Sequence, residues 1–378
     1  MTLNSTSYVK RAEVVNSDED VAVKEFAAGV EQPDMAGVVF FCSADYDLEK
    51  LGTAMKARFN CPVIGCTSAG EIASTYQNGG IVGASFSGAA FQMHTAVIND
   101  LDRFTIEAAD ELVHDLKSEL EFTKELNSEK MFGFLLIDGL SLMEERTIAP
   151  LYKALGLVSI IGGSAGDSLN FKDTKIYADG SFHSDAAVFA LMETTLPFYT
   201  FKLQHFLPTE MDLIITESDP AKRIVYEING EPAANEYAEI LGIDRERLNP
   251  QIFSMYPLML QIGNDWYVRS IEKMNEDGSL TFYCAIDNGL PLNLARGVGF
   301  IKTLSGQVEQ IKKKFSRIEL TLGCDCILRR LELQKTGVQA DVEALLGQIN
   351  FVGFSTFGEQ YDSIHVNQTM TGVVIGGA

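Results

Sequence analysis

Three short glycine-containing turns carry the residues whose chemistry stands out, and each turn ends in a carboxylate. They are the segments 65–71 (Gly-Cys-Thr-Ser-Ala-Gly-Glu), 162–167 (Gly-Gly-Ser-Ala-Gly-Asp) and 353–359 (Gly-Phe-Ser-Thr-Phe-Gly-Glu). Each follows a short apolar run, which is typical of a strand that leaves a sheet into a turn that glycine permits. If the turns meet in a cleft, their charges could hold the ammonium and carboxylate groups of a small metabolite such as an amino acid. The candidate cleft residues are Glu71, Asp167, Arg269 and Glu359.

A structural role for the same charges is an open alternative. Each turn carboxylate could close its own turn by accepting backbone N–H bonds. Arg269 lies on a predicted strand among Trp266, Val268 and Ile271, where it would then be a salt-bridge partner.

The segment 162–166 also matches Gly-x-Ser-x-Gly, the pattern of a hydrolase nucleophile elbow. An elbow must open a helix, and residues 167–173 have no helical periodicity. The other two turns carry Thr67-Ser68 and Ser355-Thr356 in the same frame, which favours a shared structural turn. We therefore expect no enzyme, with a serine or cysteine hydrolase that uses Ser164 or Cys66 as the alternative.

The elements before each turn repeat as well. An apolar strand (38–41, 134–137 and 318–322) leads into a small or acidic loop, a helical stretch and a second strand. The helical stretches place apolar residues three and four apart, as in an amphipathic helix. These units predict an α/β (α+β) fold with internal duplication and mixed sheets.

The length and the change in pattern along the chain favour two domains. At 378 residues the chain is long for one core. Long antiparallel strands begin after Pro197 and Pro208. The predicted domains are residues 1–200 and 201–378.

Bulk charge narrows the range of partners. The chain has 30 Lys and Arg against 52 Asp and Glu, a net charge of −22, which opposes binding to nucleic acid or to an anionic membrane. No apolar run of about 18 residues and no signal-peptide pattern occur, so a cytoplasmic protein is expected. The cysteines are then expected to be thiols, and Cys324-Asp325-Cys326 has no matching second pair for zinc.

The turn motifs resemble those of a known family. The segments 65–71 and 162–167 look like the signature turns of the FIST N-terminal domain. The segments 229–233, 268–271 and 358–369 look like those of the FIST C-terminal domain. This resemblance covers nearly the whole chain and implies a bacterial signal-input protein that binds a small ligand.

Three further segments resemble the haem-binding, nitric-oxide-sensing branch of FIST proteins. They are 205–209 (His-Phe-Leu-Pro-Thr), 325–332 (Asp-Cys-Ile-Leu-Arg-Arg-Leu-Glu) and 353–369. The resemblance implies haem b as cofactor, nitric oxide as ligand, and a partner histidine kinase or cyclic-di-GMP synthase or phosphodiesterase. It does not identify the histidine that holds the iron, and a homo-oligomer is left open.

His205 is the best candidate for the axial ligand of a haem iron. Strand alternation places it on one face with the apolar residues Tyr199, Phe201, Leu203 and Leu207, and burial favours the neutral imidazole that iron needs. We expect Phe201, Leu203 and Leu207 to line the cofactor site. A core histidine bonded to a backbone carbonyl is the alternative for His205.

His365 is the second candidate for the iron ligand. It precedes Asn367-Gln368-Thr369, polar residues that could instead fix the backbone beside the third turn. The remaining histidines are expected to be structural or exposed: His94, His114 and His183.

Overall fold

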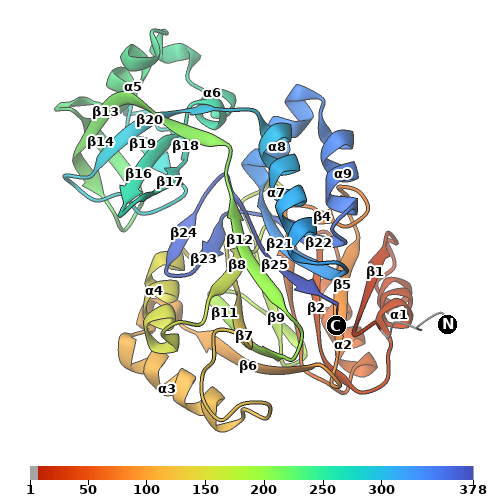
Figure 1. Ribbon diagram of the computed structural model, residues 1–378. Coiled ribbons are helices and arrows are strands. Elements are labelled where there is room, and N and C mark those ends of the chain that lie inside the picture. The colour runs from red at the N-terminus through yellow and green to blue at the C-terminus, as the bar shows by residue number, and fades with distance from the viewer. Residues whose placement is uncertain (1–6, 378) are drawn as a thin grey trace.

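The computed structural model describes residues 7–377 and confirms an α/β fold with mixed sheets and repeated units (Figure 1). Each unit is a pair of parallel strands joined by one or two helices. The units are β2 (Met35–Ser43), α2 (Leu48–Arg58) and β3 (Val63–Ser68); β7 (Met131–Ile137), α4 (Glu144–Leu155) and β8 (Ile160–Ser164); and β21 (Ile318–Cys326), α8 (Ile327–Thr336), α9 (Gln339–Gly347) and β22 (Phe351–Thr356).

Local sequence explains the connecting helices. In α2 the Asp47 side chain accepts a bond from the backbone N–H of Lys50, a helix N-cap, and Leu51 and Met55 are buried one turn apart. In α4 the buried face includes Ile148, Leu151 and Leu155, at the spacing the sequence predicts.

Three sheets are built around the three units. The first has the order β1 (Val9–Val14), β5 (Ile81–Ser87), β2, β3, β9 (Ile176–Ala178), β10 (Ser181–His183). The second has the order β24 (Ile364–Val366), β23 (Glu359–Tyr361), β8, β7, β11 (Ala186–Thr194), β6 (Phe91–Asn99). The third has the order β12 (Phe198–Leu203), β25 (Met370–Gly376), β21, β22, β4 (Glu71–Ile72).

The sheets share one apolar core. Phe41 of the first unit stacks on Phe354 of the third with ring centroids 4.3 Å apart, and Phe134 of the second unit lies 6.4 Å from Phe41. All three rings are fully buried. Helices cover the outer faces, namely α1 (Glu19–Val30), α3 (Ile106–Ser118), α7 (Phe300–Lys314) and the helices of the units, and η1 (Leu101–Arg103) precedes α3.

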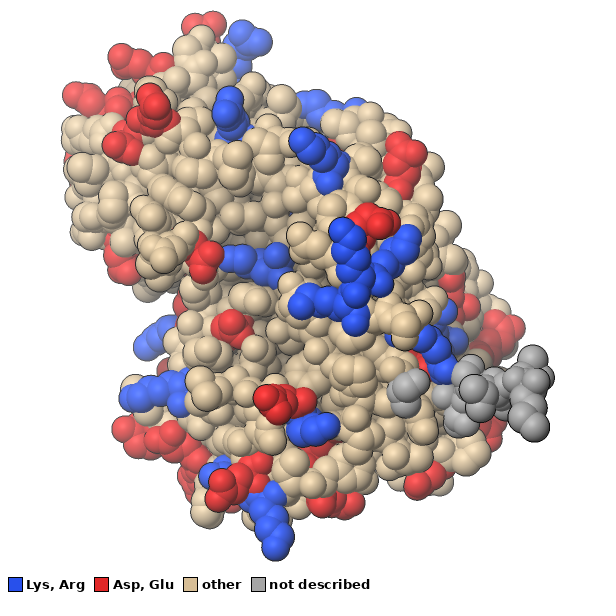
Figure 2. All heavy atoms as spheres, viewed as in Figure 1, with Lys and Arg blue, Asp and Glu red and all other residues tan. Residues whose placement is uncertain are grey.

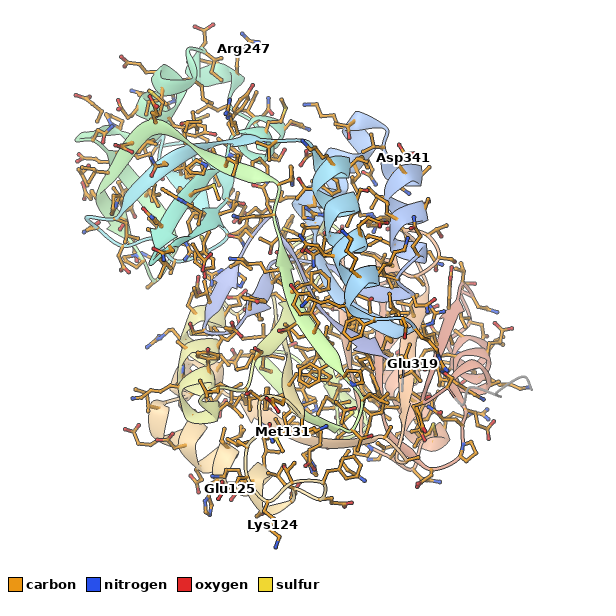
Figure 3. All side chains as sticks on the ribbon, in the orientation of Figure 1. Lys124, Glu125, Met131, Arg247, Glu319 and Asp341 are labelled. Atoms are coloured by element: carbon orange, nitrogen blue, oxygen red, sulfur yellow. The ribbon has the colours of Figure 1, made fainter. Side chains whose placement is uncertain are left out.

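Residues 206–297 form a separate antiparallel body with its own core, which we call the inserted domain (Figure 1). Its strand order is β17 (Asp265–Arg269), β16 (Leu258–Ile262), β20 (Pro291–Gly297), β13 (Phe206–Asp219), β14 (Ile224–Ile228), β19 (Leu280–Phe282), β18 (Ile271–Met274), and β15 (Glu231–Pro232) pairs with β14. It also contains α5 (Ala233–Leu241), η2 (Arg245–Arg247) and α6 (Pro250–Met255). Figure 3 shows Arg247 at its outer end, far from Met131 in the second unit.

The chain enters and leaves the inserted domain at neighbouring points. Phe206 pairs with Gly297, and the backbone N–H of Val298 donates to the carbonyl of His205 at 2.8 Å. After the inserted domain the chain returns to the third unit. Its strand β22 pairs with β4, and the next strand, β23, pairs with β8, so both pair with strands from the first half of the sequence. The division into residues 1–200 and 201–378 stays a prediction.

The surface carries charges of both signs. Acidic groups are spread around the visible outline, and basic groups gather over the end of α7, where Lys312, Lys313 and Lys314 form the last turn (Figure 2). No helix within residues 7–377 is long and apolar enough to cross a membrane.

Candidate functional site

The three glycine-containing turns do meet, and each bonds to a strand of another unit. Ala69 donates its backbone N–H to the carbonyl of Ser355 at 2.8 Å, and the backbone N–H of Ser355 donates to the carbonyl of Gly70 at 2.7 Å. The backbone N–H of Ser164 donates to the carbonyl of Gly358 at 2.8 Å, which joins the third turn to the second unit.

The second turn closes the ring back to the first. Gly166 donates its N–H to the carbonyl of Thr67 at 3.0 Å. A side chain at Gly166 would place its Cβ 2.7 Å from the backbone nitrogen of Ala69, so the close approach requires glycine. The turns are therefore interlocked at the carboxyl ends of the parallel strands, the edge where α/β sheets usually bind ligands.

The three turn carboxylates are buried and accept hydrogen bonds from their own turns and from segments beside them. Asp167 accepts the backbone N–H groups of Phe171, Lys172 and Asp173 at 2.8, 2.7 and 3.0 Å. Glu71 accepts the hydroxyl of Ser68 at 2.5 Å. The structure places these groups where they close turns, which is the structural role left open by the sequence.

Glu359 lies in the same kind of position but is the most deeply desolvated. Thr356 and Thr369 both donate hydroxyl bonds to its carboxylate, and the N–H of Thr369 donates at 3.1 Å. Burial raises the pKa of Glu359 to about 8. Its side chain is therefore mostly protonated at neutral pH.

Arg269, the fourth cleft candidate, lies at the seam with the inserted domain. Its Nη1 donates to the carbonyl oxygen of His365 at 2.9 Å, and its Nε forms no hydrogen bond within residues 7–377. Within residues 7–377 it forms no hydrogen bond or ion pair with Glu71, Asp167 or Glu359, so the four candidates do not form one cleft through direct contacts.

A large apolar cavity lies instead between the inserted domain and α8. It measures about 950 Å³, which is within the range of small-molecule and cofactor sites. Its walls come from α6, the end of β20 and the exposed side of α8 (Figure 1). The lining residues include Phe206, Met255, Tyr256, Gly297, Leu331 and Glu332.

His205 lies directly behind the wall of this cavity. It is 2% exposed, and its ring packs on Phe206 and Phe300 with centroids 4.2 and 4.8 Å away. Its Nε2 is 2.9 Å from a carboxylate oxygen of Glu332, and Arg329 donates to Nδ1 at 3.3 Å. Burial lowers the pKa of His205, which favours the neutral ring despite the opposing effect of Glu332.

Arg329 and Glu332 are the partners that sequence reasoning missed. Arg329 is fully buried and pairs with Asp325 at 2.5 Å, while Glu332 lines the cavity. The available signal was the spacing of Arg329 and Glu332, since residues three apart share one face of a helix such as α8.

The structure corrects the strand alternation expected around His205. Strand β12 ends at Leu203 and pairs with β25, whereas β13 begins at Phe206 and pairs with β20. The alternation breaks where the chain changes sheets, so Phe206 is buried and Leu207 is 49% exposed. Phe201 and Leu203 are buried as expected, but they pack in the cluster that includes α7 and not along the cavity.

His365, the second ligand candidate, lies in a closed polar network. It is fully buried, with Nδ1 3.2 Å from the Gln360 amide oxygen and Nε2 3.3 Å from the Tyr283 carbonyl oxygen. Gln360 donates to the hydroxyl of Ser164, and that hydroxyl contacts Glu144 at 3.3 Å. The network joins strands β23 and β24 to the inserted domain, through Tyr283, and to the second unit, through Ser164. Ser164 is fully buried in it.

The remaining candidates have structural partners or are exposed. His94 bonds to Glu193 at 3.0 Å, His183 lies 3.0 Å from the hydroxyl of Ser181, and His114 is exposed on α3. Burial raises the pKa of the Cys66 thiol well above its usual value, which disfavours the nucleophilic thiolate.

The residues around the cavity are chemically suited to a haem, provided that Nε2 of His205 exchanges its bond to Glu332 for one to the iron. A neutral imidazole stands behind an apolar cavity of sufficient size. The Nε2 atom is bonded to Glu332, so coordination of iron through that atom requires this carboxylate to move away. Glu332 is partly exposed and lines the cavity, which gives it room to do so.

Comparisons with known proteins agree with the turn motifs. Residues 36–231 match the FIST N domain and residues 233–362 match the FIST C domain. The chain is also 25% identical over 199 residues to an uncharacterized protein of Methanocaldococcus jannaschii. The match covers 49% of this chain and 38% of that protein, so the chain spans well under two thirds of this relative's length. Because the FIST N match alone covers more than half of the chain, the protein belongs to the FIST family, whose domains have a signal-sensing role.

Proposed function

We propose that this chain is a sensor that binds haem in the cavity between α6 and α8 and responds to nitric oxide. The observation that carries this proposal is the position of His205, a buried and neutral imidazole immediately behind an apolar cavity of about 950 Å³. Haem bound there would supply an iron that captures nitric oxide. In this role the chain would have no catalytic turnover of its own.

The residues of this chain divide the task. His205 would hold the iron, and the apolar wall that includes Phe206, Met255 and Leu331 would exclude water from it. Glu332 holds Nε2 in the absence of iron and would leave it on binding. The adjacent Arg329 donates to Nδ1, which fixes the orientation of the ring.

The cavity is also well placed to pass on a signal. Both connections to the inserted domain, at His205–Phe206 and at Gly297–Val298, lie at its wall or directly behind it. A ligand that changes the position of His205 would therefore act on the joint of the inserted domain. A histidine kinase or cyclic-di-GMP enzyme that contacts this domain is the partner we propose.

A haem-free sensor of a small metabolite is the second candidate. The observation that favours it is that both ring nitrogens of His205 already have partners, Glu332 and Arg329. In that case the ring would have a purely structural role, and an apolar metabolite would occupy the cavity without a metal.

Titration with haemin separates the two functions. The wild-type protein and the variants His205→Ala, His365→Ala and His114→Ala are compared by absorption after reduction and exposure to nitric oxide. Haem sensing predicts that only His205→Ala loses the sharp Soret band among correctly folded variants, and His114 is the exposed control. A wild-type spectrum equal to that of free haemin would reject haem and leave the metabolite sensor.

A further inference from the structure

A second hollow lies beside the apolar cavity, at the interlocked turns. It measures about 440 Å³ and shares Leu331 and Gln334 of α8 with the cavity. Its lining combines apolar residues, neutral hydrogen-bonding side chains and one cation. The lining residues are Ala69, Asn78, Ser168, Leu169, Asn170, Ile327, Arg330, Leu331 and Gln334.

The cation is Arg330, which is 4% exposed. Its Nη1 donates to the carbonyl of Ala69 at 3.1 Å and its Nη2 to the carbonyl of Gln77 at 3.0 Å. No ion pair within 4.0 Å involves Arg330 in the part of the chain that the structure describes.

Of the three other buried arginines, two hold ion pairs, and Arg269 holds none within the described residues. Arg329 pairs with Asp325 at 2.5 Å and Arg223 with Glu144 at 2.6 Å. Arg330 instead lies over the ring of Tyr76, with Cζ 5.5 Å from the ring centroid, and has no carboxylate within ion-pair distance in the described residues. A buried charge without an opposite charge is costly, so a ligand anion would stabilise it. A guanidinium has five N–H donors, and the two bonds to carbonyls leave donors for an anion in the hollow.

The first turn is shaped to receive this side chain. Gly70 has a φ of +128°, and a Cβ at this position would overlap Nη1 of Arg330. The absence of a side chain at Gly70 thus lets the guanidinium lie against the turn. Arg330 is therefore held at a fixed place in the wall of the hollow.

We propose that Arg330 binds the carboxylate of a ligand in this hollow. The lining has no Asp or Glu that could hold an ammonium group, so the ligand is a carboxylate with an uncharged body. Asn78, Ser168, Asn170 and Gln334 would bond its polar atoms. The carboxylate is either that of a free small acid or a propionate of haem that reaches over Leu331 from the cavity; only the second source rests on the proposed function.

Two variants test this site, so that the test does not depend on either one of them folding correctly. Arg330→Gln removes the cation but also alters its bonds to the turn. Gln334→Glu leaves Arg330 in place and puts a competing carboxylate into the hollow from an exposed position. Gln261→Glu, exposed on the inserted domain, is the matched control for the added charge.

Calorimetric titration with pyruvate and absorption titration with haemin distinguish the sources. A free acid predicts pyruvate binding that weakens about tenfold or more in Arg330→Gln and Gln334→Glu and is unchanged in Gln261→Glu and His205→Ala. A propionate predicts instead that haemin affinity falls by a similar factor in the first two variants while the Soret position stays the same.

The site is overturned if Gln334→Glu and folded Arg330→Gln bind both probes as tightly as wild type, or if wild type binds neither. Failure of the haem proposal looks different. In that case haemin does not bind, but the pyruvate response and its loss in Gln334→Glu persist.

Discussion

The carboxylate of Glu332 lies 2.9 Å from Nε2 of His205, at the wall of the apolar cavity. The same nitrogen cannot both hold this hydrogen bond and coordinate iron. Glu332 therefore competes with the proposed cofactor. We predict that Glu332→Ala binds haem at least as tightly as wild type, as measured by haemin titration.

The pKa of His205 gives an independent check on this pair. Glu332 raises that pKa, against the larger lowering by burial. In Glu332→Ala the pKa of His205 should fall further, measured by NMR titration of the ring. If Glu332→Ala instead loses haem as His205→Ala does, Glu332 is a part of the site and not a competitor.

A second prediction concerns the seam between the inserted domain and the second unit. Arg223 is 3% exposed and pairs with Glu144 at 2.6 Å and Glu145 at 2.7 Å. Arg223→Met leaves Glu144 buried without its charge partner. Unfolding in urea should show a loss of about 3–5 kcal/mol.

The adjacent Lys222 is the control for this prediction. Its side chain is 70% exposed and pairs with Asp219 at the surface. Lys222→Met should change the free energy of unfolding by less than about 1 kcal/mol. Equal effects of the two substitutions would show that the buried pair does not stabilise the seam.

A third prediction follows from Glu359. Its pKa is raised to about 8 in the folded protein from 4.5, so the folded state keeps a proton that the unfolded chain has lost between these values. Stability from this group is complete below pH 4.5 and falls as pH rises through 8. The variant Glu359→Gln cannot ionise and should lack this loss.

The comparison is made between pH 6 and 8. Over that range wild type should lose about 2 kcal/mol relative to Glu359→Gln, measured as the difference between their free energies of unfolding. Parallel pH profiles for the two proteins would mean that Glu359 is already ionised in the fold.

A fourth prediction separates backbone strain from crowding in the first turn. Gly70 and Gly79 both have positive φ, +128° and +89°, but only Gly70 faces an occupied space. Gly79→Ala should cost about 1–3 kcal/mol from strain alone. Gly70→Ala should cost more, because its methyl group also displaces Arg330. Equal melting temperatures for the two variants would contradict this placement of Arg330.

Local patterns were enough to predict the repeated units and their turns. The runs before Glu71, Asp167 and Glu359 have the strand and turn composition that the structure shows. The interlocking of the turns could not be predicted, because bonds such as Ser355 to Gly70 join segments far apart in the sequence, and a shared turn pattern does not say which turns pair.

The candidate site was predicted only in part for the same reason. Burial of His205 followed from its apolar neighbours, but its partner Glu332 lies 127 positions away in the sequence. The exposure of Leu207 was missed because alternation assumes one continuous strand, and the chain changes sheets after Leu203. Such changes depend on tertiary pairing and not on local sequence.

The central claim is that His205 holds a haem iron at the cavity between α6 and α8. The most direct measurement is the absorption spectrum of the haemin-loaded, reduced protein before and after nitric oxide, for wild type and His205→Ala. We predict a sharp Soret band that shifts with nitric oxide in wild type and is absent in the variant. A band that persists in folded His205→Ala, or a wild-type spectrum equal to that of free haemin, would contradict it.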